Sequence, residues 1–452
     1  MLLFKLECKR LFSGLINKLV LLLLVVSGVL AIYQGAQGYK AQRIDQYKST
    51  VVFQKEREHV SNRETLPEAG SLAYYAAAPT QWQLSPWAAL FVGETPSSMV
   101  ASKIRATALQ GQIFNREIVN PTQQRAGGLD LGFVLVYLLP LVIGILTVTL
   151  IADEQHAGRW RLLNALPSSA FSQVLRQLAL RFVVLWLLIF LLLFSAALLL
   201  SLPFDATFWV VLTATSVYML FWFALAGFIM SFSKSGVFNS LAYLSSWVLV
   251  AILIPGAVHL YLANQFSSNA PLEMSLKQRM VLNDGWDKDK QTTLDEFLAI
   301  ESQWQNTAPL GAAFDWKWYY AQQHMSDLAV AEQWQSYIAS SWARQERLAA
   351  LSVFSPALFF QLRLNQLANT SSRSQLEYLQ EIGAYHQQVR HFFYDFLFFA
   401  KPVTKQDIAN FPLFKVTTQA TNLRLVELLI SSLLVLLLAG IAAVRLKRVA
   451  AC

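Results

Sequence analysis

The chain has 452 residues, of which 55% are hydrophobic and only 14% are charged. A soluble domain carries about 25% charged residues, so this composition excludes an ordinary soluble protein and indicates an integral membrane protein. The net charge of +8 comes from dispersed lysines and arginines without a dense basic block, which excludes a nucleic-acid partner.

Residues 1–14 predict a short amphipathic helix that lies on the cytoplasmic surface of the membrane. Its charged side chains, which we expect to face water, are Lys5, Glu7, Lys9 and Arg10. The alternative is a basic leader ahead of a membrane anchor. The next run, 15–33, predicts the first transmembrane helix. Its short length also fits the core of a signal peptide cleaved near Ala31 or Ala36.

Six apolar runs are long enough to cross the lipid bilayer as helices, which takes about 20 residues. They are residues 15–33, 129–152, 178–202, 208–232, 237–262 and 423–444. Pro140 and Pro255 each interrupt a run and predict a kink, where a carbonyl loses its helical partner. Arg181 stands near the start of the third run, and we expect it to snorkel to the membrane surface as an anchor.

The short connections between the runs follow the positive-inside rule. Segments 153–177 and 445–452 and the turn at Lys234 carry lysine or arginine, whereas the turn 202–207 carries neither. Both termini and the 153–177 loop are therefore predicted to be cytoplasmic, with the protein in a bacterial inner membrane.

The two long polar regions, 34–128 and 263–422, fall on the extracytoplasmic side, and we expect them to pack together. The predicted fold class is an α-helical integral membrane protein. It has six transmembrane helices and a large, mainly helical extracytoplasmic domain built from these two insertions. In the second insertion, a helical pattern of apolar residues starts near Ser374, with Ser372 and Gln375 as its predicted capping box.

The sequence contains no motif for catalysis or metal binding. A phosphate-binding loop and the common hydrolase and zinc signatures are absent, so we expect no enzyme activity, no metal and no cofactor bound by this chain. His386 and His391 lie five residues apart, on different faces of a helix, and are expected to be exposed. Cys8 and Cys452 both fall on the cytoplasmic side, so we expect free thiols.

The most informative stretch is the loop between the second and third runs, D-E-Q-H-A-G-R-W-R-L-L-N-A-L-P-S-S, residues 153–169. Gly158 allows the backbone to turn, and Pro167 ends the short helix that follows. The hydrophobic residues spaced along one face of that helix are Trp160, Leu162, Leu163 and Leu166. The charged residues expected to stay free for a partner surface are Glu154, Arg159 and Arg161.

Glu154, followed by Gly158 and a leucine-rich turn closed by Pro167, resembles the cytoplasmic segment of ABC-2-type transporter permeases. Arg159 departs from this pattern, because the family usually has threonine or serine after the glycine. Two more segments, 128–141 and 355–368, are similar to a subfamily with large outer insertions after the first span and before the last. An ordinary amphipathic connector is the alternative interpretation of the loop.

The resemblance implies the membrane subunit of an ATP-driven exporter, paired in the bilayer with a second copy or a related permease. Separate cytoplasmic ATPase subunits, which hold the ATP and magnesium, would dock on residues 153–169 and also on 1–14. The alternative function is mechanical: ATP hydrolysis would move the outer domain against a periplasmic or outer-membrane partner without substrate crossing the membrane.

Overall fold

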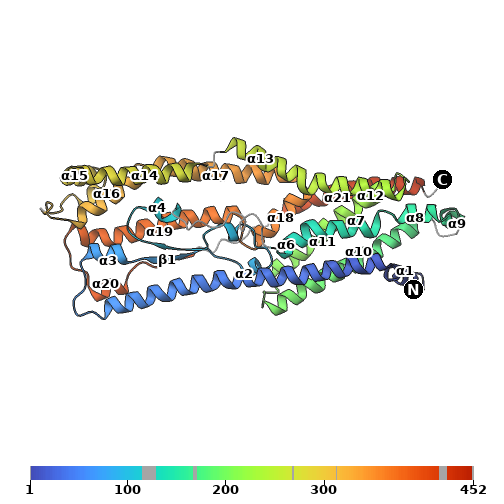
Figure 1. The fold of residues 1–452 in the computed structure, drawn as a ribbon, viewed down its shortest axis with the longest axis horizontal. Helices are drawn as coiled ribbons and strands as arrows, with labels where there is room; N and C mark the ends of the chain where they lie inside the picture. Colours follow the sequence, from blue (N-terminus) through green and yellow to red (C-terminus); the bar gives the residue numbers. More distant parts are fainter. Residues whose placement is uncertain are drawn as a thin grey trace.

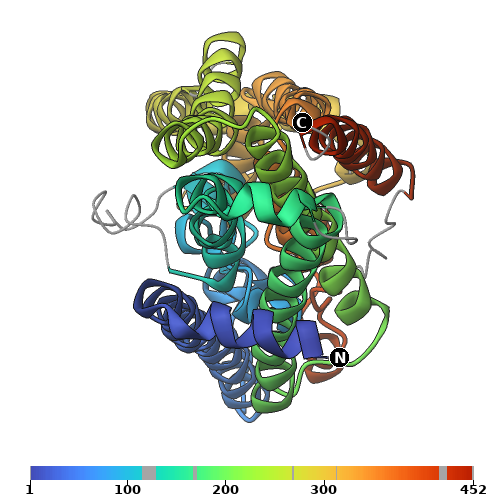
Figure 2. The same cartoon turned by 90° about the vertical axis from the view of Figure 1, so that its right-hand side faces the viewer.

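The computed structural model is elongated, with a bundle of membrane-length helices at one end and a second helical region at the other (Figure 1). It describes residues 2–114, 129–165, 170–266, 269–311, 313–416 and 425–449. We call residues 41–114 and 269–416 the distal domain. We call the opposite end, which carries α1 (Leu2–Ser13), α8 (Leu150–His156) and α9 (Arg159–Ala165), the basal end. Figure 2 looks onto the basal end, where both chain termini lie.

Five helices of the described residues are long and apolar enough to cross a membrane. They are Leu15–Ser61 (α2), Leu131–His156 (α6 to α8), Ala170–Leu199 (α10), Ala206–Met230 (α11) and Gly236–Asp287 (α12 to α14). A further apolar helix, α21 (Leu425–Val449), packs along α11 and contains most of the sixth predicted run. The protein is therefore mainly helical, with several helices of membrane length.

Helix α2 runs without a break for 47 residues, through the bundle and into the distal domain. At 1.5 Å per residue it is ~70 Å long, about twice the thickness of a bilayer's hydrocarbon core. Nothing between the half in the bundle and the half in the distal domain stops the helix. Gly35 lies where they join, and a Cβ there would come within 2.2 Å of the Ala89 carbonyl oxygen.

The second membrane helix contains a π-turn just before Pro140, the residue at which the sequence predicted a kink. It starts as α6 (Leu131–Phe133), widens into the π-turn η3 (Val134–Leu138) and continues as α7 (Leu139–Thr147). Pro140 has no N–H to give to the carbonyl of Val136, one turn back. The hydroxyl of Tyr218 on α11 donates to that oxygen at 2.7 Å instead.

The fifth membrane helix repeats this arrangement at Pro255. Helix α12 (Gly236–Val248) widens into the π-turn η4 (Leu249–Leu253), and α13 (Ile254–Gln265) follows. Here Ser355 donates to the carbonyl of Val250 at 2.6 Å. Because Ser355 also caps α18 (Pro356–Leu367), this hydrogen bond ties a membrane helix to the second insertion.

The two insertions share one hydrophobic core, as predicted. The first contributes Phe53 and Trp82, and the second contributes Phe297 and Ile382. The helices of the first insertion beyond α2 are α3 (Ala69–Tyr75) and α4 (Leu109–Phe114), with short turns η1 (Pro86–Ala89) and η2 (Thr95–Ser97). Its strands β1 (Ala78–Gln81) and β2 (Ala101–Ile104) pair antiparallel, with Ala78 opposite Ile104.

The described secondary-structure elements of the second insertion are all helices. These are α14 (Ala270–Asp287), α15 (Lys290–Ile300), η5 (Ser302–Trp304), α16 (Trp316–Leu328), α17 (Ala331–Leu351), η6 (Ser352–Phe354), α18, α19 (Ser372–Phe398) and α20 (Lys405–Ala409). The predicted capping box at Ser372 is wrong. The helix starts one residue earlier than that box requires, so Ser371 is its cap and accepts from the Ser374 N–H at 3.3 Å.

A buried ion pair within the second insertion is hydrogen-bonded to the backbone of the first insertion. Arg390 on α19 donates to Asp327 on α16 at 2.6 Å, and its Nε also donates to the Ala106 carbonyl of the first insertion. Asp327 accepts in addition from the Leu109 N–H and from Gln278. Burial raises the pKa of Asp327, and the guanidinium of Arg390 opposes this. The hydrogen bonds fix how the two insertions meet, because each buried polar group needs its partner.

His386 was expected at the surface and is instead buried, because its helix face turns into the domain core. Its Nε2 donates to the Thr107 carbonyl at 2.7 Å. His391, on another face, is exposed as predicted. Burial, with the nearby Arg390 charge, lowers the pKa of His386 and that of His324, the latter to about 3. Both imidazoles are therefore neutral in the folded domain at neutral pH.

We expect mild acid to destabilise the distal domain. An unfolded histidine has a pKa of about 6.5, so below this pH the unfolded chain binds protons that folded His324 and His386 do not. Above pH 6.5 the two histidines therefore do not reduce the free energy of unfolding. Below this pH the free energy of unfolding falls, by about 2 kcal/mol per histidine at pH 5.

The measurement is the unfolding temperature of the detergent-purified protein at pH 7 and pH 5. The loss between these two values should be smaller in His386→Gln and unchanged in the control His391→Gln. Burial raises the pKa of Asp327, so its protonation favours the folded state as the pH falls and opposes the effect of the histidines. The test is therefore the difference between the variants in this loss of unfolding temperature. Equal losses in all three proteins would contradict the assignment.

Candidate functional site

The α8–α9 turn at the basal end is built as the sequence predicted. At the end of helix α8, the Ala157 N–H donates to the backbone carbonyl of Asp153, and the Gly158 N–H donates to the backbone carbonyl of Gln155, both at 3.0 Å. Gly158 has φ +70°, a conformation that favours glycine at a helix C-terminus. A Cβ at this position would meet no atom within 4 Å, so the turn needs glycine for its backbone rather than for space.

Glu154 lies in the middle of the basal end and is not free for a partner, which corrects the sequence interpretation. Its carboxylate accepts from Arg159 Nε at 2.7 Å and pairs with the Arg10 guanidinium of α1. The glutamate side chain is only 5% exposed, whereas those of Arg10 and Arg159 are 44% and 54% exposed. The buried anion draws both arginines inward because an unpaired charge would be costly to bury.

Helix α1 lies across the basal end (Figure 2), and side chains fasten it to the bundle at two points. Arg10 reaches Glu154 on α8, and Glu7 accepts from Gln177 of α10 at 3.2 Å. The expectation that Glu7 faces water is therefore wrong, since it is half-buried against α10, whereas Arg10 is exposed as predicted although it pairs with Glu154. Lys9 is exposed as predicted, and the side chain of Lys5 lies outside the described residues.

Helix α9 presents an apolar side chain at the basal surface. Trp160 is half-buried and packs against a small cluster that includes Ile151, Val174 and Met230, so it anchors the helix to protein. Leu163 is half-buried, and Leu162 is 68% exposed. The side chain of Arg161 and residues 166–169, with Leu166 and Pro167, lie outside the described residues.

The second membrane helix breaks between α7 and α8, and side chains from two other helices hold the freed carbonyls. Arg181 of α10 donates to the Leu146 carbonyl at 2.7 Å, and Asn239 of α12 donates to the Val148 carbonyl at 3.1 Å. Arg181 is 6% exposed, so the predicted snorkelling anchor is wrong: its guanidinium turns inward because unpaired backbone acceptors are there.

Sequence reasoning missed Gln177 and Asn239 as members of this site and gave Arg181 a different role. One signal was present in the sequence. A charged or amide side chain within an apolar run is expensive in lipid, so it usually faces a polar partner inside the bundle. For Arg181 and Asn239 the identity of that partner was hidden, because it is a main-chain oxygen exposed only by a helix break. For Gln177 the partner is Glu7, which lies on the distant helix α1.

The contacts at the basal end connect several helices to one another. Among the described residues no cluster of three or more histidine, cysteine, aspartate or glutamate side chains is placed to hold a metal ion. Glu154 instead connects α1, α8 and α9, and the break above α8 connects them to α10 and α12. A force on α9 would therefore reach several membrane helices through charged and hydrogen-bonded contacts.

Comparison with known proteins identifies one segment. Residues 272–417 match the family described as a domain of unknown function, DUF3526. This segment is the helical part of the distal domain from α14 to α20. It includes only the end of one membrane-length helix, Gly236–Asp287, and no part of the basal end. No curated protein and no solved structure matches the chain.

We expect loss of the Glu154 charge to release α1 from the bundle, which Cys8 on α1 can report. In a Cys452→Ser background, Glu154→Gln should make Cys8 react with a maleimide roughly fivefold faster, which corresponds to about 1 kcal/mol for a half-exposed ion pair. Asp153→Asn is the matched control, because Asp153 is exposed and its carboxylate bonds only locally, to Thr149. Equal Cys8 labelling rates in the two variants would show that Glu154 does not hold α1.

Proposed function

We propose that this chain is the membrane-spanning permease subunit of an ATP-binding-cassette exporter of the ABC-2 type. In this proposal six helices cross the bacterial inner membrane: α2, α6–α8, α10, α11, α12–α13 and α21. The basal end is cytoplasmic and the distal domain is extracytoplasmic. The supporting observation is the basal end itself, where Glu154 gathers α1 and α9 beneath a break in a membrane helix.

The proposed mechanism starts with a separate cytoplasmic ATPase that docks on α9 and on α1. Leu162 gives this surface an exposed apolar contact, and Arg10 and Arg159 give it positive charge. Closure of the ATPase pushes α9, and Glu154 makes α1 and α8 move with it. The break between α7 and α8 lets the basal part pivot, because Arg181 and Asn239 keep its carbonyls paired.

A second permease, identical or related, completes the transport pathway in this proposal. The membrane helix that starts with α12 supports it, since only 17% of its most apolar window is buried within the chain, the lowest share of the five candidate spans. Its exposed side chains include Val237, Leu241 and Leu244, which need lipid or another helix as cover.

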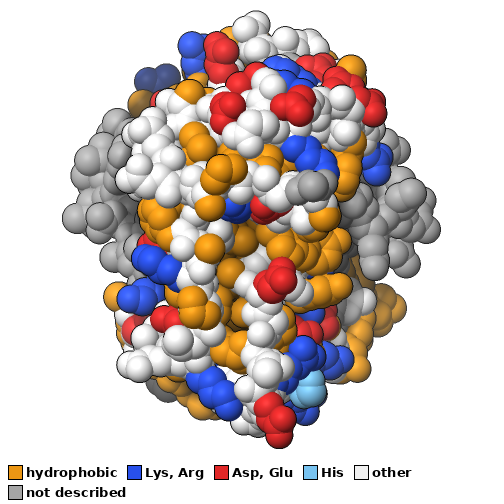
Figure 3. All heavy atoms as spheres, turned by 90° about the vertical axis from the view of Figure 1, so that its left-hand side faces the viewer, with side chains coloured by type: hydrophobic (Ala, Val, Ile, Leu, Met, Phe, Trp, Pro, Cys, Tyr) orange, Lys and Arg blue, Asp and Glu red, His pale blue; other side chains and the backbone are white. Residues whose placement is uncertain are grey.

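The mechanical alternative is favoured by the continuous connection from the basal end to the tip of the distal domain. Helix α2 is unbroken across this distance, and α18 wedges between the domain and the bundle, where Phe360 stacks on Tyr218 at 4.5 Å. Figure 3 shows the tip with hydrophobic side chains gathered at its centre and charged ones around them. The exposed large side chains at this end include Tyr75 on α3, Ile300 on α15 and Phe314 just before α16.

Such a tip suits contact with an envelope partner. The two functions differ in what they require: ATPase activity stimulated by a substrate, with uptake into inverted vesicles, supports export. Cross-links from Phe314 to a partner, without substrate flux, support mechanical transmission.

Replacing Leu162 by glutamate should disrupt docking of the ATPase. The tagged chain, purified in mild detergent, is expected to bring with it a subunit that hydrolyses ATP, and Leu162→Glu should lower the bound ATPase activity at least about tenfold, as a charge buried at an interface does. Leu272→Glu makes the same change at an exposed leucine of α14 in the distal domain and should have no effect. Undiminished ATPase with Leu162→Glu would remove α9 as the docking site.

Labelling of intact cells should place the two ends on opposite sides of the membrane. With Cys8 and Cys452 replaced by serine, a membrane-impermeant maleimide added from outside should modify Leu272→Cys and leave Leu162→Cys unmodified until the cells are lysed. The outer membrane must first be permeabilised if one is present. The reverse pattern would invert the topology and end the proposal of cytoplasmic docking.

A further inference from the structure

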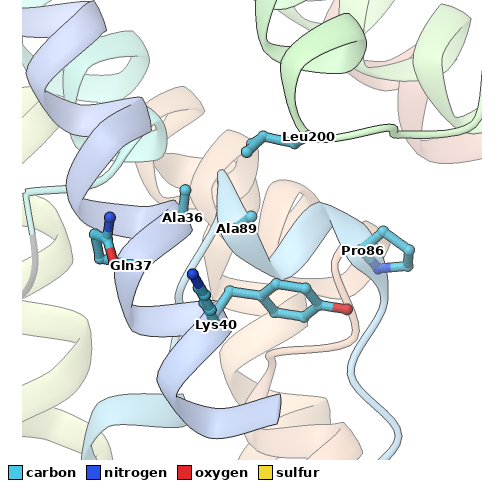
Figure 4. A pocket seen from close by; sticks show the side chains of 7 residues that line it. Ala36, Gln37, Lys40, Pro86, Ala89 and Leu200 are labelled. Carbon is cyan, nitrogen blue, oxygen red and sulfur yellow. The ribbon is translucent and has the colours of Figure 1, made fainter. Parts of the chain in front are cut away.

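A groove of about 290 Å³ opens where the membrane helices meet the distal domain (Figure 4). Three segments line it. Helix α2 contributes Ala36, Tyr39 and Lys40, η1 contributes Pro86 and Ala89, and the turn after α10 contributes Leu200. The apolar run of α2 ends just before Ala36, and α10 ends just before Leu200, so the groove lies at the level where both helices leave the bilayer.

The groove is apolar inside and cationic at its rim. Ala36 and Ala89 face each other across it, with Leu200 on the far side of the opening and Lys40 one turn along α2 from Ala36 (Figure 4). Gln37 adds an amide at the edge. Towards the bilayer, the surface continues with apolar side chains, since Tyr33 is 61% and Leu199 is 80% exposed.

Lys40 is available for an anion. It is exposed, and within the part of the chain that the structure describes no carboxylate lies within ion-pair distance of it. Asp45, the nearest acidic residue along α2, is five positions away and on a different face of the helix. Arg43, one turn further on, adds a second exposed positive charge.

We propose that this groove binds an anionic phospholipid of the surrounding bilayer, with its phosphate on Lys40 and one acyl chain between Ala36 and Leu200. An ammonium at the membrane surface beside an apolar slot matches both parts of such a molecule. A zwitterionic lipid has the same phosphate, but its own ammonium offsets the attraction to Lys40. The site requires membrane insertion and does not depend on the proposed transport function.

The bound lipid would connect the three segments that form the groove. Gly35 and Ala89 already touch there through a backbone contact that excludes any Cβ. A lipid lying against α2, η1 and the end of α10 would fill the remaining space, so the position of the distal domain on the bundle would depend on the lipid's headgroup charge.

The test is native mass spectrometry of the full detergent-purified chain with phosphatidylglycerol or phosphatidylcholine of identical acyl chains. We expect roughly tenfold tighter binding of phosphatidylglycerol at one site, the size of effect that a charge-assisted hydrogen bond gives. Lys40→Glu should abolish this preference, and Lys40→Arg should keep it. Ala36→Phe, which fills the slot, should weaken both lipids.

Lys55→Glu is the matched control, because it makes the same charge change on an exposed part of α2 about 22 Å from Lys40. It should leave the lipid preference intact. The proposal is overturned if Lys40→Glu retains the preference or if Lys55→Glu removes it equally. Displacement of the lipid by glycerol phosphate alone at equal concentration would also overturn it, since the headgroup would then bind without the acyl chain.

Discussion

Inside a membrane-length bundle, every backbone carbonyl that a helix break releases must find a donor, because lipid offers none. At each irregular point described above, a side chain from another element donates a hydrogen bond to the freed carbonyl. Tyr218 serves the turn before Pro140, and Ser355 serves the turn before Pro255. At the break between α7 and α8, Arg181 and Asn239 serve two carbonyls together.

These four hydrogen bonds also join the irregular helices to neighbouring elements. Each bond joins the irregular point to a different element: α11, α18, α10 or α12. A change at one break is therefore felt by a second helix, and the breaks lie along the route from the basal end to the distal domain. The same requirement that keeps the bundle stable thus connects each irregular point to another element.

At the basal end, a buried charge rather than a freed carbonyl requires a partner from another segment. Glu154 is buried, and its two arginine partners come from α1 and from the start of α9. A carboxylate in that position fixes where both helices sit. In the distal domain, the almost fully buried pair of Asp327 and Arg390 joins α16 to α19 and is hydrogen-bonded to the backbone of the first insertion. These two carboxylates hold together segments that are distant in sequence, α1 with α8 and α16 with α19.

The sequence by itself determined the membrane-length runs, the two polar insertions, the glycine turn at Gly158 and the irregular turns at Pro140 and Pro255. These follow from hydropathy, proline geometry and the backbone freedom of glycine, all of which act locally. Only the tertiary structure decided that α2 continues unbroken into the distal domain, that Glu154 is enclosed, that Arg181 turns inward and that His386 is buried. In each of the last three cases the deciding partner lies on another segment, and neither spacing nor composition can reveal which distant group a polar side chain will meet.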